Sequence, residues 1–152
     1  MPTLADRPLA ANPFVTVSPG LVCVMTLDAA RRITHANADM RRALGFGAKA
    51  CADRPLRSCC HPDMPPQVLR DVWVMLDDGL VWSAPLKWLR ADGAGLWMRT
   101  VFAPMQRGAS DGCSMVVGLA VSVSQVQAAE RVYGAMRRHR AERESAFAGG
   151  ER

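Results

Sequence analysis

Reactive side chains are concentrated in one short run, Cys59-Cys60-His61-Pro62-Asp63. Thiol, imidazole and carboxylate groups this close together could ligate a metal ion, support nucleophilic catalysis or hydrogen-bond the edge of a ligand. A structural zinc site needs four ligands, commonly in paired Cys-x-x-Cys or His-x-x-x-His units, and adjacent cysteines do not easily point at one ion. We therefore expect no metal site.

Catalysis has equally little support in the sequence. A thiol nucleophile needs a base and an orienting group, and the three histidines, His35, His61 and His139, carry no local signature of that role. A phosphate-binding loop is also not expected, because Gly45-Phe46-Gly47 lacks a third glycine and follows a predicted helix rather than a strand. We expect that the protein is not an enzyme.

The run His61-Pro62-Asp63-Met64-Pro65 allows two interpretations. In the first, His61 and Asp63 form the polar rim of a ligand pocket. In the second, Asp63 caps a helix that begins near Pro65, and His61 lies on the surface.

Four tryptophans are many for a chain of this size, and indoles can either pack a core or wall a planar ligand. Trp73 lies on the apolar face of a predicted helix, which favours the core. Trp82 opens a strand after Gly79, so we expect it at the mouth of a pocket between sheet and helices.

The 152 residues suit one domain with tails, and a composition of 49% hydrophobic and 22% charged residues is ordinary for a globular protein. The first residues lack the apolar segment of a signal peptide, and the longest apolar run, 115–121, is too short to cross a bilayer. Five cysteines, an odd number, favour reduced thiols. We expect a cytoplasmic protein without membrane insertion.

A net charge of +5 raises the question of nucleic acid. The arginines are dispersed and no basic stripe interleaved with aromatic residues is visible, so we expect no nucleic-acid binding.

Hydrophobic periodicity predicts an α+β domain. We expect a flexible arm over 1–19 that ends in a turn at Pro19-Gly20, then a central strand (21–27) covered on both faces. The remaining elements are a partner strand (31–36), a helix from the N-cap Asn37 to Gly45, a loop (47–65), a helix from Pro65 to about Asp77, strands over 81–90, 96–105 and 113–124, and a helix over 125–147.

This order predicts a five-stranded antiparallel sheet with short helices on one face and a C-terminal helix. The last strand alternates large and small residues, which leaves one sheet face open to a ligand or a protein. In the last helix, Val126, Ala129, Tyr133 and Met136 form a short apolar seam that must pack on the sheet, on a second copy or on a partner.

The stretch from about Leu21 to Val123 resembles a PAS domain, and more narrowly the FAD-binding N-terminal PAS domain of bacterial aerotaxis receptors. The motifs that carry the resemblance are Ile33-Thr34-His35-Ala36-Asn37, Gly45-Phe46, His61-Pro62-Asp63-Met64-Pro65, Asp71-Val72-Trp73, Leu76-Asp77-Asp78-Gly79, Trp82-Ser83, Lys87, Asp92-Gly93, Trp97-Met98-Arg99 and Pro104-Met105.

The resemblance implies a non-covalently bound FAD that reports redox state. It places His61 and Asp63 at the rim of the flavin site, Trp82 against the ring system and Asn37 at the pocket end of the first helix. A slot walled by indole and edged by a few polar groups suits a planar ring.

Two residues depart from the family pattern. Cys60 stands where the family usually has arginine, and Trp88 stands where it has asparagine. Losing these groups removes polar contacts worth about 1–3 kcal/mol each if buried. Arg57 or Arg90 could replace the lost polar contacts, so Arg57 joins the predicted site. Trp88 joins it because it stands at a position where the family contacts the cofactor. A light-sensing flavin site is not expected, because that chemistry needs an Asn-Cys-Arg context and the corresponding segment is Arg54-Pro55-Leu56-Arg57.

These observations predict a PAS sensory domain over 20–124, a signalling or dimerisation helix over 125–148 and a disordered tail over 149–152. The predicted function is to bind FAD and relay redox, oxygen or energy status to a signalling protein or a second copy. The alternatives are a ligand-free module for protein–protein interaction and a pocket adapted to another small ligand.

Overall fold

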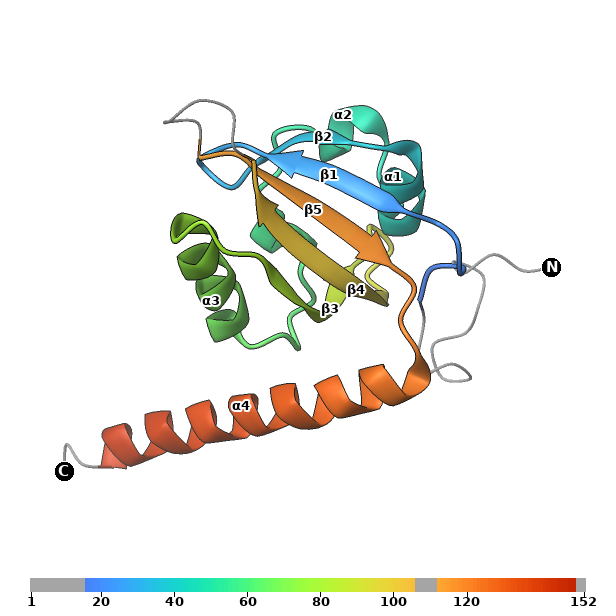
Figure 1. The fold of residues 1–152 in the computed structure, drawn as a ribbon. Helices are drawn as coiled ribbons and strands as arrows, with labels where there is room; N and C mark the ends of the chain where they lie inside the picture. Colours follow the sequence, from blue (N-terminus) through green and yellow to red (C-terminus); the bar gives the residue numbers. More distant parts are fainter. Residues whose placement is uncertain (1–15, 106–111, 150–152) are drawn as a thin grey trace.

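The computed structural model describes residues 16–105 and 112–149 (Figure 1). In chain order the elements are β1 (Cys23–Leu27), β2 (Ile33–Ala36), α1 (Ala38–Leu44), α2 (Ala48–Cys51), the 3-10 helix η2 (Leu56–Cys59), α3 (Pro66–Asp77), β3 (Trp82–Leu89), β4 (Gly95–Pro104), β5 (Ser114–Leu119) and α4 (Val123–Gly149).

The five strands form one antiparallel sheet in the order β2-β1-β5-β4-β3, so the first and last strand pairs meet through β5 in the centre. The hairpin of β3 and β4 runs from the pair Trp82–Phe102 to the pair Leu89–Gly95. The chain turns between these two strands at Gly93, whose φ of +87° is a backbone conformation that glycine adopts more easily than other residues. The expected sheet of five antiparallel strands is confirmed.

Successive strand residues point to opposite faces, which defines an inner and an outer face of the sheet. Trp73 of α3 makes an edge-to-face contact with Phe102 of β4, so the inner face is the one covered by α3. Its largest side chains are fully buried together with those of the short helices. They are Met25, Leu27, Met40, Leu44, Leu56, Leu86, Trp88, Leu96, Met98 and Phe102.

The outer face carries α4, which lies along one side of the sheet in Figure 1 and continues well beyond it. Tyr133 stacks on Trp97 of β4 at a centroid distance of 6.3 Å and an interplanar angle of 2°, and its hydroxyl donates a 2.7 Å hydrogen bond to the carbonyl of Pro85. Val126 and Ala129 are buried in the same contact. The predicted seam therefore packs on the sheet.

Local signals account for the helix ends. The side chain of Asn37 caps α1 by accepting a hydrogen bond from the backbone N–H of Met40, and Gly45 ends that helix with a φ of +77°. Helix α3 starts with proline in its first turn, as expected, but no side chain caps it. The expectation that Asp63 caps this helix is wrong, because its carboxylate instead binds Lys87.

Four further details differ from the sequence expectation. Short helices α2 and η2 lie within the expected loop over 47–65, and β5 ends at Leu119 rather than Ser124. The expected turn at Pro19-Gly20 is present. The last residues of the expected flexible arm are instead held by the domain, because Thr16 forms a bridge with Trp97 and Val17 is buried. Strand β1 is buried on its inner side and only half-buried on the other, so it is not covered on both faces. Residues 1–15 and 106–111 lie outside the described residues.

Candidate functional site

The predicted site residues fall on both faces of the sheet. Trp82 and Trp88 lie on the inner face because their strand partners, Phe102 and Leu96, belong to it. Trp82 is half-buried and meets the Phe102 ring edge-on at 5.7 Å between centroids. Trp73, Trp82 and Phe102 thus form an aromatic cluster at the end of β3 that lies next to α3.

Trp88 is fully buried in the core, with 0% of its surface exposed. Its indole N–H donates a 3.0 Å hydrogen bond to the hydroxyl of Thr100, which in turn donates to the carbonyl of Met98. Its polar group is therefore satisfied inside the protein, and nothing drives it toward solvent. Cys60 stands opposite Trp88 in an isolated antiparallel bridge, so the two departures from the family pattern are direct neighbours.

His61 and Asp63 belong to the other side of the sheet. The backbone N–H of His61 bonds to the carbonyl of Lys87 on the free edge of β3, and the Lys87 ammonium lies 3.0 Å from the Asp63 carboxylate. Lys87 pairs with Trp97, which faces α4. Gly95 makes room for this arrangement, since a Cβ there would lie 2.5 Å from Cε of Lys87 and 3.4 Å from the His61 ring.

The surroundings of His61 determine which ring nitrogen carries the proton and which charge state is favoured. Its Nδ1 accepts a 3.1 Å hydrogen bond from the backbone N–H of Asp63, which places the ring proton on Nε2. Burial, followed by the positive charge of Lys87, lowers the pKa of His61 and outweighs the opposing effect of Asp63. The 3.6 Å approach of His61 to the Asp63 carboxylate is therefore not an ion pair at neutral pH.

Asp63 also connects this segment to α4. Its carbonyl accepts a hydrogen bond from the guanidinium of Arg137, and the hydrogen bond from Lys87 is the main cause that lowers the pKa of its carboxyl. Arg137 was not among the predicted site residues. Its position one helical turn after Tyr133 in the seam is the signal that could have identified it.

Two predicted residues have other surroundings. The Asn37 side chain accepts hydrogen bonds from the backbone N–H groups of Met40 and Val24 and donates to the carbonyl of Val22, so it joins α1 to β1. Arg57 is exposed on η2. Arg90, the other candidate for compensation, is buried and already bonds to the carbonyl of Ala43 and to Asp92.

The six predicted residues therefore do not form one rim. Trp82 and Trp88 lie on the inner face, His61 and Asp63 lie toward α4, Asn37 is at the start of α1, and Arg57 is on the surface. Their role in binding a ligand stays a prediction. The arrangement does bring together a different group, His61, Asp63, Lys87 and Arg137, between the edge of β3 and α4.

The inner face does not fit a flavin ring in this arrangement. Trp88, Met98 and Phe102 fill it with fully buried side chains. A flavin offers several hydrogen-bonding edges, and the buried polar side chains of these strands are Thr100, which is bonded to Trp88, and Ser114, whose hydroxyl has no partner among the described residues. A ring could enter only if Trp88 moved.

Other reactive groups offer little chemistry. Burial, with a smaller contribution from Cys59, raises the pKa of the Cys60 thiol to about 12, so this thiol is protonated and a poor nucleophile. Within residues 16–105 and 112–149, no three His, Cys, Asp or Glu side chains gather closely enough to hold a metal ion. None of the helices in those ranges is long and apolar enough to cross a membrane.

An antiparallel sheet of this order, with short helices over one face and a long helix leaving its last strand, defines a sensory-domain class of fold. Residues 33–120 match the family described as PAS fold, and the chain belongs to that family. It is also 27% identical over 133 residues to the aerotaxis receptor of Escherichia coli (strain K12), covering 84% of this chain and 26% of the receptor. The chain thus spans about a quarter of the receptor's length.

Solved structures agree with this fold. A light-oxygen-voltage domain studied with a flavin analogue superposes with a TM-score of 0.64 at 19% identity, covering 75% of this chain and 87% of that domain. The PAS domain of a protein from Colwellia psychrerythraea gives a TM-score of 0.60 at 14% identity, covering 66% of this chain and 86% of the other. The expected PAS fold and the resemblance to aerotaxis receptors are confirmed.

Proposed function

We propose that this chain is a non-enzymatic PAS signalling domain that acts through contact, with α4 as its output. The observation that carries the proposal is the double attachment of α4. Tyr133 holds it to Trp97 on the outer face, and Arg137 holds it to the backbone of Asp63. A change in the core or at the edge of β3 must therefore alter how α4 packs.

The closed inner face supports a module without a resident flavin. Trp88 is buried, hydrogen-bonded and opposite Cys60, which is a self-consistent replacement for the polar pair that the family pattern has at these positions. A partner can shift such a domain between two states only by binding them with different affinity. The proposed input is thus contact with a signalling protein.

Hydrogen exchange on the purified protein tests the proposal. Trp88→Leu leaves a cavity in the core without touching α4, and we expect the amides of α4 to lose protection more than those of β1. Equal loss in β1 and α4 would mean that the domain only loosens as a whole. Unchanged exchange in α4 would show that the helix is a static brace, and the proposed output would be wrong.

A redox sensor that binds FAD is the second candidate, favoured by the likeness to the aerotaxis receptor over 84% of this chain. The protein should be denatured and its supernatant chromatographed. Stoichiometric FAD would favour the redox sensor and would require Trp88 to leave the inner face. A colourless protein that cannot be reconstituted with FAD would favour the closed core.

A further inference from the structure

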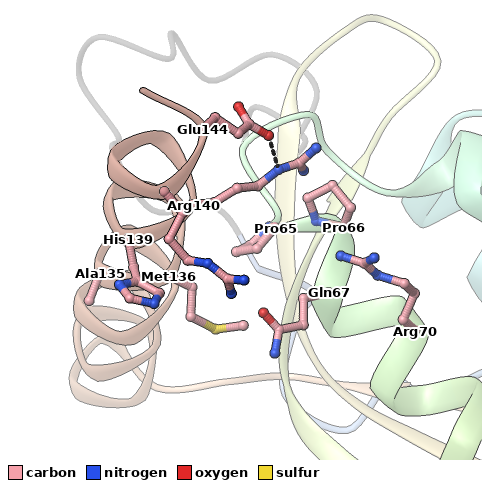
Figure 2. A pocket seen from close by; sticks show the side chains of 10 residues that line it. Pro65, Pro66, Gln67, Arg70, Ala135, Met136, His139, Arg140 and Glu144 are labelled. Carbon is pink, nitrogen blue, oxygen red and sulfur yellow. Dashed lines mark hydrogen bonds and ion pairs between the residues drawn. The ribbon is translucent and has the colours of Figure 1, made fainter. Parts of the chain in front are cut away.

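A groove of about 880 Å³ runs between the start of α3 and the second half of α4. Figure 2 shows the side chains of Pro65, Pro66, Gln67 and Arg70 on one wall and those of Ala135, Met136, His139, Arg140 and Glu144 on the other. The groove begins where the segment around His61 and Asp63 ends. It therefore lies beside the attachment of α4, outside the site described above.

Both apolar and charged side chains line this groove. Pro65, Pro66 and Met136 give it an apolar part, whereas Arg70, Arg140 and Arg143 contribute three positive charges. Glu144 is the one carboxylate among the lining residues, and it is 2.8 Å from Arg140, with which it forms an ion pair along the helix. The groove thus carries a net positive charge beside an apolar surface.

The second half of α4 has little support of its own. The helix spans 27 residues, about 40 Å at 1.5 Å per residue, and among residues 123–146 the buried ones lie in the first half, up to Gly134. Residues 137–146 are all exposed. Most helical stability in proteins comes from packing of one face, and this half packs little of its surface within the domain, so its side chains are available to a partner.

We propose that this groove, here called the α3–α4 groove, binds an acidic amphipathic helix of a partner protein. Aliphatic side chains of that helix would lie on Pro65, Pro66 and Met136, and its carboxylates would pair with Arg70 and Arg143. This inference rests on the proposed function, since it names the class of partner that reads the position of α4.

Charge makes a second copy of this chain a poor occupant. Residues 137–144 contain four arginines and two glutamates, so pairing this half of α4 with itself would bring two positive segments together. Nucleic acid is also disfavoured, because no Trp, Tyr or Phe lines the groove and the imidazole of His139 is the one ring there on which a base could stack.

The test uses the full chain and a fluorescent helical peptide of about 16 residues, long enough to hold a helix, with leucines on one face and glutamates on either side. We expect saturable binding that weakens at least about tenfold in Arg70→Glu and in Arg143→Glu. Arg42→Glu, an exposed arginine of α1, is the matched control and should bind like the wild type. The same peptide with glutamine in place of glutamate should bind at least about tenfold more weakly.

The proposal is overturned if the peptide shows no saturable binding up to about 1 mM, if Arg42→Glu weakens binding as much as the groove variants do, or if the glutamine peptide binds equally well. It is also overturned if single-stranded DNA displaces the peptide with equal affinity. Hydrogen exchange of α4 in Trp88→Leu, measured beside the peptide titration, separates the two ideas. Protection of α4 that responds to Trp88→Leu while the peptide fails to bind would leave the proposed function standing without this groove.

Discussion

Among single residues, Trp88 is the one whose side chain closes the inner face of the sheet. Its indole occupies the inner face, and its N–H is satisfied by Thr100. A buried polar group left without a partner costs about 1–3 kcal/mol, so this hydrogen bond contributes to keeping the indole in the core. The pair Trp88–Thr100 therefore stabilises the closed form of the inner face.

Removing the hydroxyl of Thr100 tests this contribution. Thr100→Val keeps the shape of the side chain but leaves the indole N–H unpaired, and we expect the free energy of unfolding to fall by about 1–3 kcal/mol. Thr100→Ser keeps the acceptor and should cost less than Thr100→Val. Urea denaturation measures both. A loss in Thr100→Ser equal to that in Thr100→Val would show that packing, not the hydrogen bond, is important here.

Restoring the family residues tests whether the core replaced a flavin site. Cys60→Arg combined with Trp88→Asn removes the indole and returns two polar groups to adjacent positions, so we expect flavin occupancy to rise above that of the wild type. Trp88→Ala is the control that opens space without polar groups and should bind less. Removing a buried tryptophan costs about 3–5 kcal/mol, so folding must be confirmed by circular dichroism. A folded double mutant with unchanged flavin content would show that Cys60 and Trp88 are not what keeps flavin out.

Among the elements, the segment from Cys60 to Met64 is the connection between the two faces. Its backbone pairs with the edge of β3 at Trp88 and Lys87, and Arg137 joins it to α4. The sequence identified this segment as distinctive, and the family resemblance placed it at the rim of a ligand site. The residues could not show this contact, because the partners Lys87 and Arg137 are 24 and 74 positions away from Asp63.

Elements themselves were easier to predict than their contacts. Apolar runs, turn residues and the alternation of the last strand identified the five strands of the described residues. Helical spacing identified α3, composition identified α4, and Asn37 and Gly45 marked the ends of α1 correctly. The short helices α2 and η2 were missed because four residues carry no helical period. The sequence also did not predict which residues of neighbouring strands lie opposite each other, because a single sequence does not specify the register of the strands.

The pH dependence of stability reports on the tie between Asp63 and Lys87. The pKa of Asp63 is lowered in the folded state, so its contribution is present above the ordinary value of 3.8 and is lost as pH falls through the folded pKa. We expect Asp63→Asn to flatten the decline in the free energy of unfolding below about pH 4, measured by urea denaturation across a pH series. Because this carboxylate is more than half exposed, the effect will be small.

Two comparisons keep that measurement specific. Asp71→Asn removes an exposed carboxylate of α3 and should leave the acid decline unchanged. His61 produces a separate effect, because its pKa is lowered from 6.5 and stability falls as pH drops below that value. The decline that begins near pH 6.5 should therefore persist in Asp63→Asn. If Asp71→Asn flattens the acid limb equally, the result reflects net charge rather than the contact with Lys87.

At the scale of the whole molecule, α4 consists of two halves with different roles. The first half covers Trp97 and buries Val126, Ala129 and Tyr133. Residues 138–146 are exposed, and His139, Arg140, Arg143 and Glu144 among them line the α3–α4 groove. The first half should therefore be needed for the fold, and the second half for contact with a partner.

Two truncations separate these roles. A chain that ends at Arg138 keeps the stacking of Tyr133 on Trp97 and the hydrogen bond of Arg137, so we expect its free energy of unfolding to stay within about 1 kcal/mol of the full chain. A chain that ends at Ser122 uncovers Trp97, and exposing large apolar side chains costs about 1.5–3 kcal/mol each. It should bind a hydrophobic dye and self-associate in analytical ultracentrifugation. If the chain ending at Ser122 stays monomeric and as stable as the full chain, α4 does not belong to the folded domain. If instead the chain ending at Arg138 unfolds, the exposed half supports the fold and is not reserved for a partner.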